Sequence, residues 1–459
     1  MQYVSTRGHS ARKDFSAILT AALAQDGGLY MPDHIDSFTH EEITALKDAS
    51  YAQLATRILS YFAGDSIACS DVEQAIEKGL KRFTSPQIAP LTKLGGNRWL
   101  LELYHGPTLA FKDYALQIVA ELINDQLNRT DQRAMVLCAT SGDTGAAAAA
   151  AFAGRNRVKV VVLHPEGRVS DVQRRQMTTL PDDNILNVAI RGDFDDCQAL
   201  VKAMFQDSIA DDLKLTAVNS INWARIVSQV VYYAWASLQL ADKGNPHFVV
   251  PTGNFGNILA AQVARKLGFP IGQLTLSSNE NDVLPRFFES GHMQRRETLP
   301  SLSPSMDIQV SSNFERALWW AMDCDSDALR ASQQALAETG EYAVPEDIMT
   351  RLREHFNAVR CTKVDAVKEI QRVHKENNLA ICPHTATASF ASRSIDASNN
   401  PVVVVATAHP AKFPVGVEQA LGAVEPLPDD IERALSGEER FITLDADLDQ
   451  LRQKLIDFS

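Results

Sequence analysis

Continuous apolar runs of strand length recur along the chain, separated by segments whose apolar residues have helical spacing. The runs are MVLCAT (135–140), VKVVVLHP (158–165), HFVVPTG (247–253) and PVVVVATAHP (401–410). A strand of a parallel sheet is covered by helices on both faces, so its sequence is apolar throughout and does not alternate. The pattern therefore predicts an α/β fold with open parallel sheets.

The beginning of the chain has a different pattern. FSAILTAALA and EEITALKDASYAQLATRIL carry apolar residues at helical spacing, with DGGLYMPD between them. We therefore expect three regions: a mostly helical N-terminal domain (1–90), a segment that contains a small α/β domain (91–245), and the remainder of a large α/β domain (246–459). Near the end, DIERAL and DLDQLRQKL predict surface helices.

Polar loops follow three of the predicted strands. They are SGDTG after 135–140, PTGNFGN after 247–250, and TAHPAKF after 402–406. Ligands of open α/β sheets bind outside the carboxyl ends of the strands. We therefore expect the three loops to meet in one crevice.

The motif PTGNFGN (251–257) is a strand-to-helix turn. Gly253 and Gly256 allow successive N–H groups to point inward, and the following helix adds free N–H groups and its dipole. Asn254 and Asn257 add neutral donors. These features fit a phosphate cup, although an ordinary tight turn has the same composition, and the motif is neither a dinucleotide fingerprint nor a P-loop.

The segment ATSGDTGAAAAAA (139–151) places hydroxyl groups at the start of an alanine-rich helix. Thr140, Ser141 and Thr144 can cap this helix or hold an anion. Asp143 falls in the first turn, where a carboxylate interacts favourably with the helix dipole. Taken alone, the loop favours capping.

In HGPTLAFKDYALQIVAEL (105–122), a lysine lies beside the apolar stripe of a predicted helix. Lys112 is flanked by Phe111, Ala115 and Val119. A lysine in such a place usually buries its stem and keeps its ammonium group in water. A desolvated lysine, in contrast, loses proton affinity and becomes a nucleophile suited to a Schiff base.

NSINWARIVSQ (219–229) also allows two interpretations. Asn219 and Ser220 precede a predicted helix, where both residue types are common caps, and Arg225 would then lie on the surface. Alternatively, Arg225 gives bidentate hydrogen bonds to a bound phosphate.

Charge and cysteine content limit the partners and the cellular compartment that we expect for the protein. The formal net charge is −13, without a basic block, which argues against nucleic acid or an anionic membrane as a partner. The six cysteines form no C-x-x-C pair, so we expect reduced thiols in a cytoplasmic protein. The sequence contains neither a signal peptide pattern nor an apolar run of transmembrane length.

Five motifs together resemble those of the threonine synthase family. They are HGPTLAFKD, ATSGDTG, NSINWAR, PTGNFGN and TAHPAKF, in this order, and the similarity covers nearly the whole chain. The family belongs to the fold type II enzymes, which use pyridoxal 5′-phosphate (PLP). The resemblance implies that fold type II architecture, with two α/β domains, and PLP as the cofactor.

The resemblance also implies a role for each motif. Lys112 would form the Schiff base with PLP, and Thr407 would face the pyridine nitrogen. Asp143 would lie near the 3′ oxygen of the cofactor, although many fold type II enzymes have Asn there. The cofactor phosphate would be held by Gly253, Asn254, Phe255, Gly256 and Asn257. The substrate would be held by Thr140, Ser141, Thr144, Asn219, Ser220 and Arg225.

The implied reaction converts O-phospho-L-homoserine and water into L-threonine and phosphate. Lys112 would act as general base at Cα, phosphate would leave from Cγ, and water would add at Cβ. A serine/threonine dehydratase of the same fold would keep Lys112 and the cofactor cup but would need no clamp for a substrate phosphate. A non-catalytic PLP-binding sensor and a nicotinamide dehydrogenase are further alternatives. A monomer or a small homo-oligomer is expected.

Overall fold

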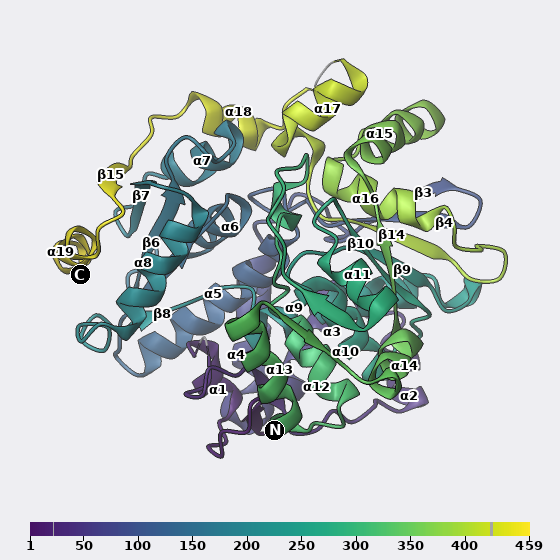
Figure 1. Cartoon of the computed structure of the whole chain (residues 1–459), viewed down its shortest axis with the longest axis horizontal. Coiled ribbons are helices and arrows are strands. Elements are labelled where there is room, and N and C mark those ends of the chain that lie inside the picture. Colours follow the sequence, from purple (N-terminus) through teal and green to yellow (C-terminus); the bar gives the residue numbers. More distant parts are fainter. Residues whose placement is uncertain (22, 423–425) are drawn as a thin grey trace.

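The computed structural model describes residues 1–21, 23–422 and 426–459, and it contains two α/β lobes (Figure 1). The larger lobe is built on a six-stranded sheet with the strand order β13-β10-β9-β14-β4-β3. Its strands are β3 (Leu91–Gly95), β4 (Arg98–Glu102), β9 (His247–Pro251), β10 (Leu274–Ser278), β13 (Phe356–Arg360) and β14 (Val402–Ala406). All neighbours are parallel except β3, which runs antiparallel to β4 at the edge.

The smaller lobe is built on a five-stranded parallel sheet with the order β15-β7-β6-β5-β8. Its strands are β5 (Ala134–Ala139), β6 (Val158–Pro165), β7 (Ile185–Arg191), β8 (Leu215–Thr216) and β15 (Ile442–Asp445). The expected α/β fold with open parallel sheets is therefore confirmed.

Helices cover both sheets. In the first half of the chain they are α5 (Lys112–Arg129), α6 (Asp143–Phe152), α7 (Asp171–Thr178), α8 (Phe194–Gln206), α9 (Trp223–Gln239) and α10 (Gly256–Lys266). In the second half they are α11 (Val283–Ser290), α12 (Phe314–Ala321), α13 (Ser326–Thr339), α14 (Glu346–His355), α15 (Lys363–Asn377), α16 (Pro383–Ser392), α17 (Pro414–Leu421), α18 (Asp429–Ser436) and α19 (Leu448–Phe458). A two-stranded antiparallel sheet, formed by β11 (His292–Gln294) and β12 (Glu341–Ala343), lies outside the two larger sheets.

The N-terminal region is mostly helical, as expected, but it also contains a two-stranded antiparallel sheet. Its elements are β1 (Tyr3–Ser5), α1 (Phe15–Leu19), β2 (Tyr30–Pro32), α2 (His40–Ala45), α3 (Tyr51–Ala63) and α4 (Cys69–Leu80). Helix α3 packs on α9, and α4 packs on α5. The region therefore shares the core of the rest of the molecule.

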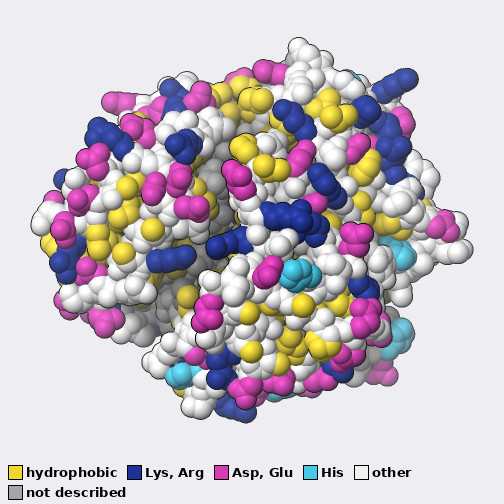
Figure 2. Space-filling view, viewed as in Figure 1, with side chains coloured by type: hydrophobic (Ala, Val, Ile, Leu, Met, Phe, Trp, Pro, Cys, Tyr) yellow, Lys and Arg dark blue, Asp and Glu magenta, His cyan; other side chains and the backbone are white. Residues whose placement is uncertain are grey.

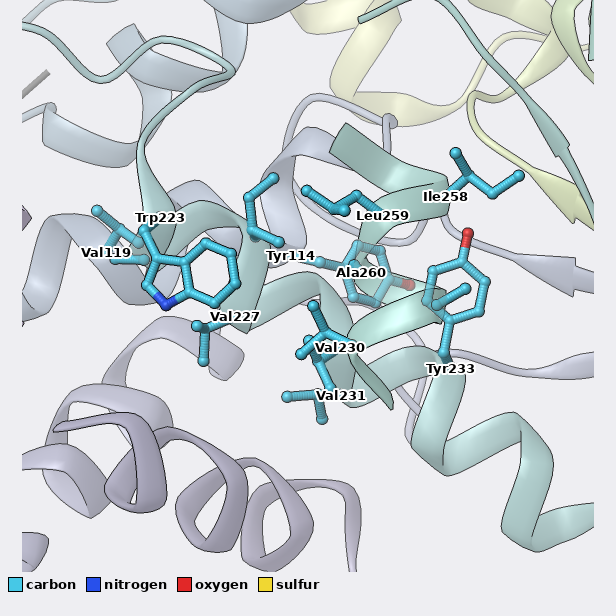
Figure 3. Close-up of a cluster of buried hydrophobic side chains, with 14 of the residues drawn as sticks. Tyr114, Val119, Trp223, Val227, Val230, Val231, Tyr233, Ile258, Leu259 and Ala260 are labelled. Atoms are coloured by element: carbon cyan, nitrogen blue, oxygen red, sulfur yellow. The ribbon is translucent and has the colours of Figure 1, made fainter. Parts of the chain in front are cut away.

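The main hydrophobic core lies where α5, α9 and α10 meet (Figure 3). The helices contribute side chains that are close to fully buried, among them Val119, Trp223, Val230, Tyr233 and Leu259. The apolar residues of α9 go almost all the way round the helix, as is typical of a helix that is buried on every side. This packing fixes the first turns of α5, α9 and α10, which carry the predicted site residues.

The chain crosses between the lobes more often than the sequence indicated. Strands β3 and β4, which precede the small lobe, belong to the large sheet, whereas β15 near the end joins the small sheet. The predicted boundary at residue 245 therefore does not separate the sheets. The two surface helices expected at the end, α18 and α19, do form, but Ile431, Leu451 and Leu455 of their inner faces are fully buried.

Candidate active site

Lys112 is the first residue of α5, and the backbone before it is held against the end of β14. The N–H of Phe111 donates to the carbonyl of Thr407 at 2.9 Å, and the N–H of His409 donates to the carbonyl of Leu109 at 3.0 Å. Thr407, which directly follows β14, is buried. The first and last of the five motifs are therefore neighbours in space.

A buried carboxylate fixes the loop that leads to Lys112. Asp113 accepts hydrogen bonds from the N–H and the hydroxyl of Thr108, both at 2.8 Å. A side chain at position 106 would clash with Asp113, because a Cβ there would lie 2.4 Å from the Asp113 Cβ. Gly106 is therefore required for the close approach of the loop to the helix, and this contact gives Lys112 a fixed position.

The ammonium group of Lys112 lies against Asp143, the first residue of α6. Its Nζ is 3.0 Å from Oδ2 of Asp143. Asp143 has three more partners: Ser305 donates to Oδ2 at 2.9 Å, Gln173 donates to Oδ1 at 2.8 Å, and Nζ of Lys412 lies 3.2 Å from Oδ1. The buried carboxylate is therefore surrounded by donors from four other segments of the chain.

Burial and charge act against each other on Lys112. Burial lowers the pKa of the Lys112 amine and is the largest effect; Asp143 raises it, whereas the cations Lys412 and Arg225 lower it further. The pKa of Asp143 is held well below its usual value, because Lys112 and Lys412 outweigh the cost of burying the carboxylate. At neutral pH the site thus contains an ionised carboxylate beside an amine that is easier to deprotonate than a surface lysine.

The expected phosphate cup is the turn between β9 and α10. Phe255 adopts the left-handed conformation with φ 61°, and its ring is buried against Phe314 and Phe356. Gly253 is required by space, because a Cβ there would lie 2.9 Å from the carbonyl oxygen of Ser305. The turn leads directly into α10, whose first N–H groups have no acceptor within the helix.

The cup fits an anionic group such as the PLP phosphate. Oδ1 of Asn257 accepts from Tyr232 at 2.6 Å and from Tyr233 at 2.7 Å, so the amide nitrogen must point the other way. That buried nitrogen has no hydrogen-bond partner among the described residues. An unpaired buried donor is costly, and a ligand acceptor would satisfy it. Together with the free N–H groups of α10, Asn257 would hold the cofactor phosphate.

The loop before α12 joins the cup to the NSINWAR segment. Ser311 donates to the carbonyl of Gly253 at 2.7 Å, and Ser312 donates to Oδ1 of Asn254 at 3.2 Å. The amide of Asn313 donates to the carbonyls of both Ser220 and Asn254 at 3.0 Å. Ser220 and the cup are therefore held together by one side chain.

The residues predicted to hold the substrate lie in several environments. Thr140 caps α6, since its hydroxyl accepts from the N–H groups of Gly142 and Gly145. Ser141 is exposed and Thr144 is half-buried. Asn219 accepts from the N–H of Ile221 at 3.3 Å, while the cap of α9 is Asn222. In the loop before α6, the capping interpretation thus applies to Thr140. Anion binding by Ser141, Thr144, Asn219 and Ser220 stays a prediction.

Arg225 is not a surface residue. Only 2% of it is exposed, and burial lowers its pKa to about 10. One guanidinium nitrogen donates to the carbonyl of Val218 at 2.9 Å, while Nε has no hydrogen-bond partner among the described residues. A buried guanidinium with an unused donor fits the role of an anion clamp.

Four residues of this site were missed from the sequence: Lys412, Gln173, Ser305 and His384. Lys412 falls within TAHPAKF, but no local pattern shows its partner. His384 stands in none of the five motifs, and no group of possible metal ligands occurs among the described residues. It accepts from the N–H of Ser305 at 3.3 Å, and burial lowers its pKa to about 3.

The surface is hollowed between the two lobes, and Lys and Arg side chains gather along the rim (Figure 2). This local positive charge contrasts with the net charge of −13. It would attract an anionic small molecule. No helix in the described parts of the chain is both long and apolar enough to cross a membrane.

Three sequence families match consecutive parts of the chain. They are described as threonine synthase N terminus for residues 2–80, pyridoxal-phosphate dependent enzyme for residues 83–344, and threonine synthase, C-terminal, for residues 385–455. The matched segments cover nearly the whole chain.

Individual relatives are similar over their full length. The threonine synthase of Pseudomonas aeruginosa is 44% identical over 456 residues, which is 98% of this chain and 96% of the relative. A crystal structure of PLP-bound threonine synthase from Brucella melitensis has 43% identity and a TM-score of 0.97, covering 100% of this chain and 99% of the other. The yeast threonine synthase structure has 33% identity and a TM-score of 0.95, covering 100% and 98%.

Proposed function

The chain belongs to the threonine synthase family, and we propose that its inter-lobe site carries out the family's reaction with Lys112 at the centre. It is a PLP-dependent enzyme that converts O-phospho-L-homoserine and water into L-threonine and phosphate. The expectations of fold type II architecture and of PLP as the cofactor are confirmed by these relatives. The roles of the individual residues are the proposal.

One chain of contacts supports this assignment most directly. Lys112 pairs with Asp143, Asp143 accepts from Ser305, and the carbonyl of Ser305 lies against Gly253 of the cup. A reactive amine and a phosphate cup are thus in one place. PLP requires this combination, because it has an aldehyde at one end and a phosphate at the other. When bound, PLP supplies an electron sink that stabilises negative charge at Cα of the substrate.

Lys112 would move the protons. Burial lowers the pKa of the Lys112 amine, which favours the neutral form that can take the Cα proton. Its position at the fixed start of α5 would restrict the movement of Nζ while it takes up and returns protons. Thr407 would face the pyridine nitrogen, and a hydroxyl there leaves that nitrogen largely unprotonated.

The substrate would be bound by Arg225, Ser220, Asn219 and the hydroxyl groups of the SGDTG loop. The phosphate that leaves from Cγ carries negative charge, and Arg225 would neutralise it as the C–O bond breaks. A proton would be returned to Cγ after phosphate has left, the hydroxyl of water would add at Cβ, and a second proton returned to Cα would complete L-threonine. The remaining proton of the water would go to the released phosphate. One water enters and one phosphate leaves for each threonine formed.

The test is to incubate the purified protein with O-phospho-L-homoserine and quantify phosphate and L-threonine in the same sample. We expect the two products to appear at a ratio of one. Phosphate accompanied by a keto acid, without threonine, would mean that the water-addition step is absent. The enzyme would then eliminate phosphate from the substrate without adding water.

Arg225→Ala separates this function from that of a dehydratase of the same fold. We expect kcat/KM for O-phospho-L-homoserine to fall by roughly 10- to 100-fold, the value of one or two lost hydrogen bonds to a charged group, while PLP stays bound. A parental kcat/KM in this variant would show that Arg225 is not the clamp.

We further propose a cytoplasmic protein that acts as a monomer or a small homo-oligomer, without nucleic acid or membrane as a partner. The six cysteines support the location, because each is free and they form no disulfide among the described residues. Size-exclusion chromatography with light scattering would determine the oligomeric state.

A further inference from the structure

The carboxylate of Asp143 is divided between two pairs of partners. Oδ2 faces Nζ of Lys112 at 3.0 Å and the hydroxyl of Ser305 at 2.9 Å. Oδ1 faces Nζ of Lys412 at 3.2 Å and the amide of Gln173 at 2.8 Å. One oxygen is thus directed at the reactive lysine, while the other is held by groups that the proposed reaction does not use.

Lys412 has a second hydrogen-bond partner besides Asp143. Its residue is 0% exposed, and Nζ donates to the carbonyl of Thr108 at 2.6 Å. It ends a short 3-10 turn (Pro410–Lys412) that begins at His409, where Nδ1 accepts the N–H of Ala411 at 3.2 Å. A buried lysine is rare unless it is paired, so this position requires the carboxylate beside it.

The proposed reaction changes the charge of Lys112 but leaves Lys412 untouched. When Lys112 bonds to the cofactor, or acts as a base, its nitrogen is no longer always an ammonium group. A buried carboxylate that loses its only cation is strongly destabilised, and it would then take up a proton or turn away. Lys412 provides a second cation that stays throughout.

We propose that Lys412 is a positioning residue: it keeps Asp143 ionised and keeps one oxygen of Asp143 aimed at Lys112 throughout the reaction. The inference rests on the proposed role of Lys112. It assigns Lys412 and Gln173 as a pair that orients Asp143 from behind, and it makes Lys412 a determinant of the protonation of Lys112.

The other ionisable groups around this cluster lie on several elements. His384 at the start of α16 faces Asp143, Arg225 on α9 faces Lys112, and Asp113 and His409 face Lys412. Both histidines have a lowered pKa, mainly because of burial, and are neutral above pH 6. The two histidines therefore contribute no change of charge to a profile that is recorded near or above neutral pH.

The experiment measures the protonation of Lys112 directly. Full-length protein is stripped of PLP, PLP is added back, and the rate at which the visible Schiff-base band appears is recorded as a function of pH. The midpoint of this profile follows the pKa of the attacking amine. The parent is compared with Lys412→Met, Lys412→Arg, Asp143→Asn and the double variant Lys412→Met/Asp143→Asn. Lys266→Met, at the far end of α10, controls for the loss of any one lysine.

The two charges must shift the midpoint in opposite directions. Removal of Lys412 removes a repulsion and raises the midpoint by about one pH unit, whereas removal of Asp143 removes an attraction and lowers it by a similar amount. Lys412→Arg keeps the charge and leaves the midpoint near that of the parent, as does Lys266→Met. The double variant lies near the parent, because the opposing effects cancel.

Three outcomes would overturn the inference: an unchanged midpoint in Lys412→Met, shifts of the same direction in Lys412→Met and Asp143→Asn, or equal shifts in Lys412→Met and Lys412→Arg. If Lys412→Met does not fold, the decision passes to Asp143→Asn, which must lower the midpoint, and to Lys412→Arg, which must keep it. A parent protein that forms no band with PLP would instead contradict the proposed role of Lys112.

Discussion

At the scale of single residues, the site depends on a balance at Lys112. Burial lowers the pKa of the amine and so favours its neutral form, whereas Asp143 raises the pKa and favours the ammonium form. The two effects together give an amine that is held in place by an ion pair and yet releases its proton more easily than a lysine in water. Such a balance is what a residue needs in order to act first as nucleophile and later as base.

Replacement of Lys112 should remove function without unfolding the protein. In Lys112→Ala we expect no visible Schiff-base band and a loss of activity of roughly 10⁴-fold or more, because both covalent attachment and base catalysis are lost. Lys112→Arg keeps a positive charge beside Asp143 and serves as the control for the ion pair. Absorbance measures the Schiff-base band, product assays measure activity, and circular dichroism shows whether the variants are folded. Residual activity close to that of the parent would exclude the assignment.

The buried His384 should make stability depend on pH. Its pKa is lowered to about 3 in the folded state, whereas an unfolded histidine has a pKa of about 6.5. The contribution of His384 is therefore complete above pH 6.5 and is lost as the pH falls towards 3. Between pH 6.5 and 5 we expect the free energy of unfolding of the parent to fall by about 2 kcal/mol more than that of His384→Gln. Denaturant unfolding at both pH values measures the free energy of unfolding of each protein. An equal change between the two pH values in the parent and in His384→Gln would show that His384 is not buried as a neutral ring.

The sequence predicted some of these residues and missed others for a physical reason. Lys112 and the Gly253–Asn257 turn stand in local motifs whose residue types indicate their chemistry. Lys412 and His384 acquire their surroundings only when Asp143, 241 or more residues away in the chain, is folded against them. A lysine or a histidine without a local partner has no pattern that distinguishes it from a surface residue.

At the scale of elements, the cup is made by one turn packed against one loop. Gly253 and the segment around Ser305 are so close that no side chain fits between them. The same segment donates to Asp143 through the Ser305 hydroxyl. A shift of this loop would therefore affect the phosphate end and the amine end of the cofactor site together.

Gly253→Ala tests this coupling. A Cβ 2.9 Å from the Ser305 carbonyl must push the loop away, and we expect the dissociation constant of PLP to increase by about 10-fold, equivalent to about 1.4 kcal/mol. The matched control is Gly272→Ala. A Cβ there would lie 2.8 Å from the Asn245 carbonyl, at the opposite end of the sheet. Equal effects of both variants on PLP affinity, measured by equilibrium titration, would mean that only general stability has changed.

Several of the strands that the sequence missed have weak patterns. The central strands are continuously apolar because both faces are covered. Strand β3 lies at an edge and is only partly buried, β8 has two residues, and β15 is half-buried. Such strands are defined by the neighbour with which they pair, and that neighbour is distant in the sequence.

At the scale of the whole molecule, the last elements of the chain stabilise a lobe that begins about 300 residues earlier. Helix α19 packs on α8, and Leu451 and Leu455 complete a core with strands β5 to β7. The small lobe is therefore assembled from residues 134–216 and from the last elements of the chain. Its stability should depend on the C-terminal helix.

Two adjacent residues of α19 test this dependence. Leu455 is 0% exposed and Ile456 is 43% exposed. We expect Leu455→Ala to lower the free energy of unfolding of the small lobe by about 2–5 kcal/mol and Ile456→Ala to change it by less than about 0.5 kcal/mol. Denaturant unfolding measures the difference. Similar values for both variants would show that the helix does not pack as described.

The late arrival of β15 also has a consequence for synthesis on the ribosome. Strand β7 ends at Arg191, but its partner β15 begins only at Ile442. At about 5–20 residues per second, the ribosome needs roughly 10–50 s to make the chain between them. For that time β7 is an open edge with unpaired N–H and C=O groups, ready to accept a strand from another nascent copy. In the folded enzyme β15 covers this edge, whereas on the polysome the edge of β7 stays unpaired until translation is nearly complete.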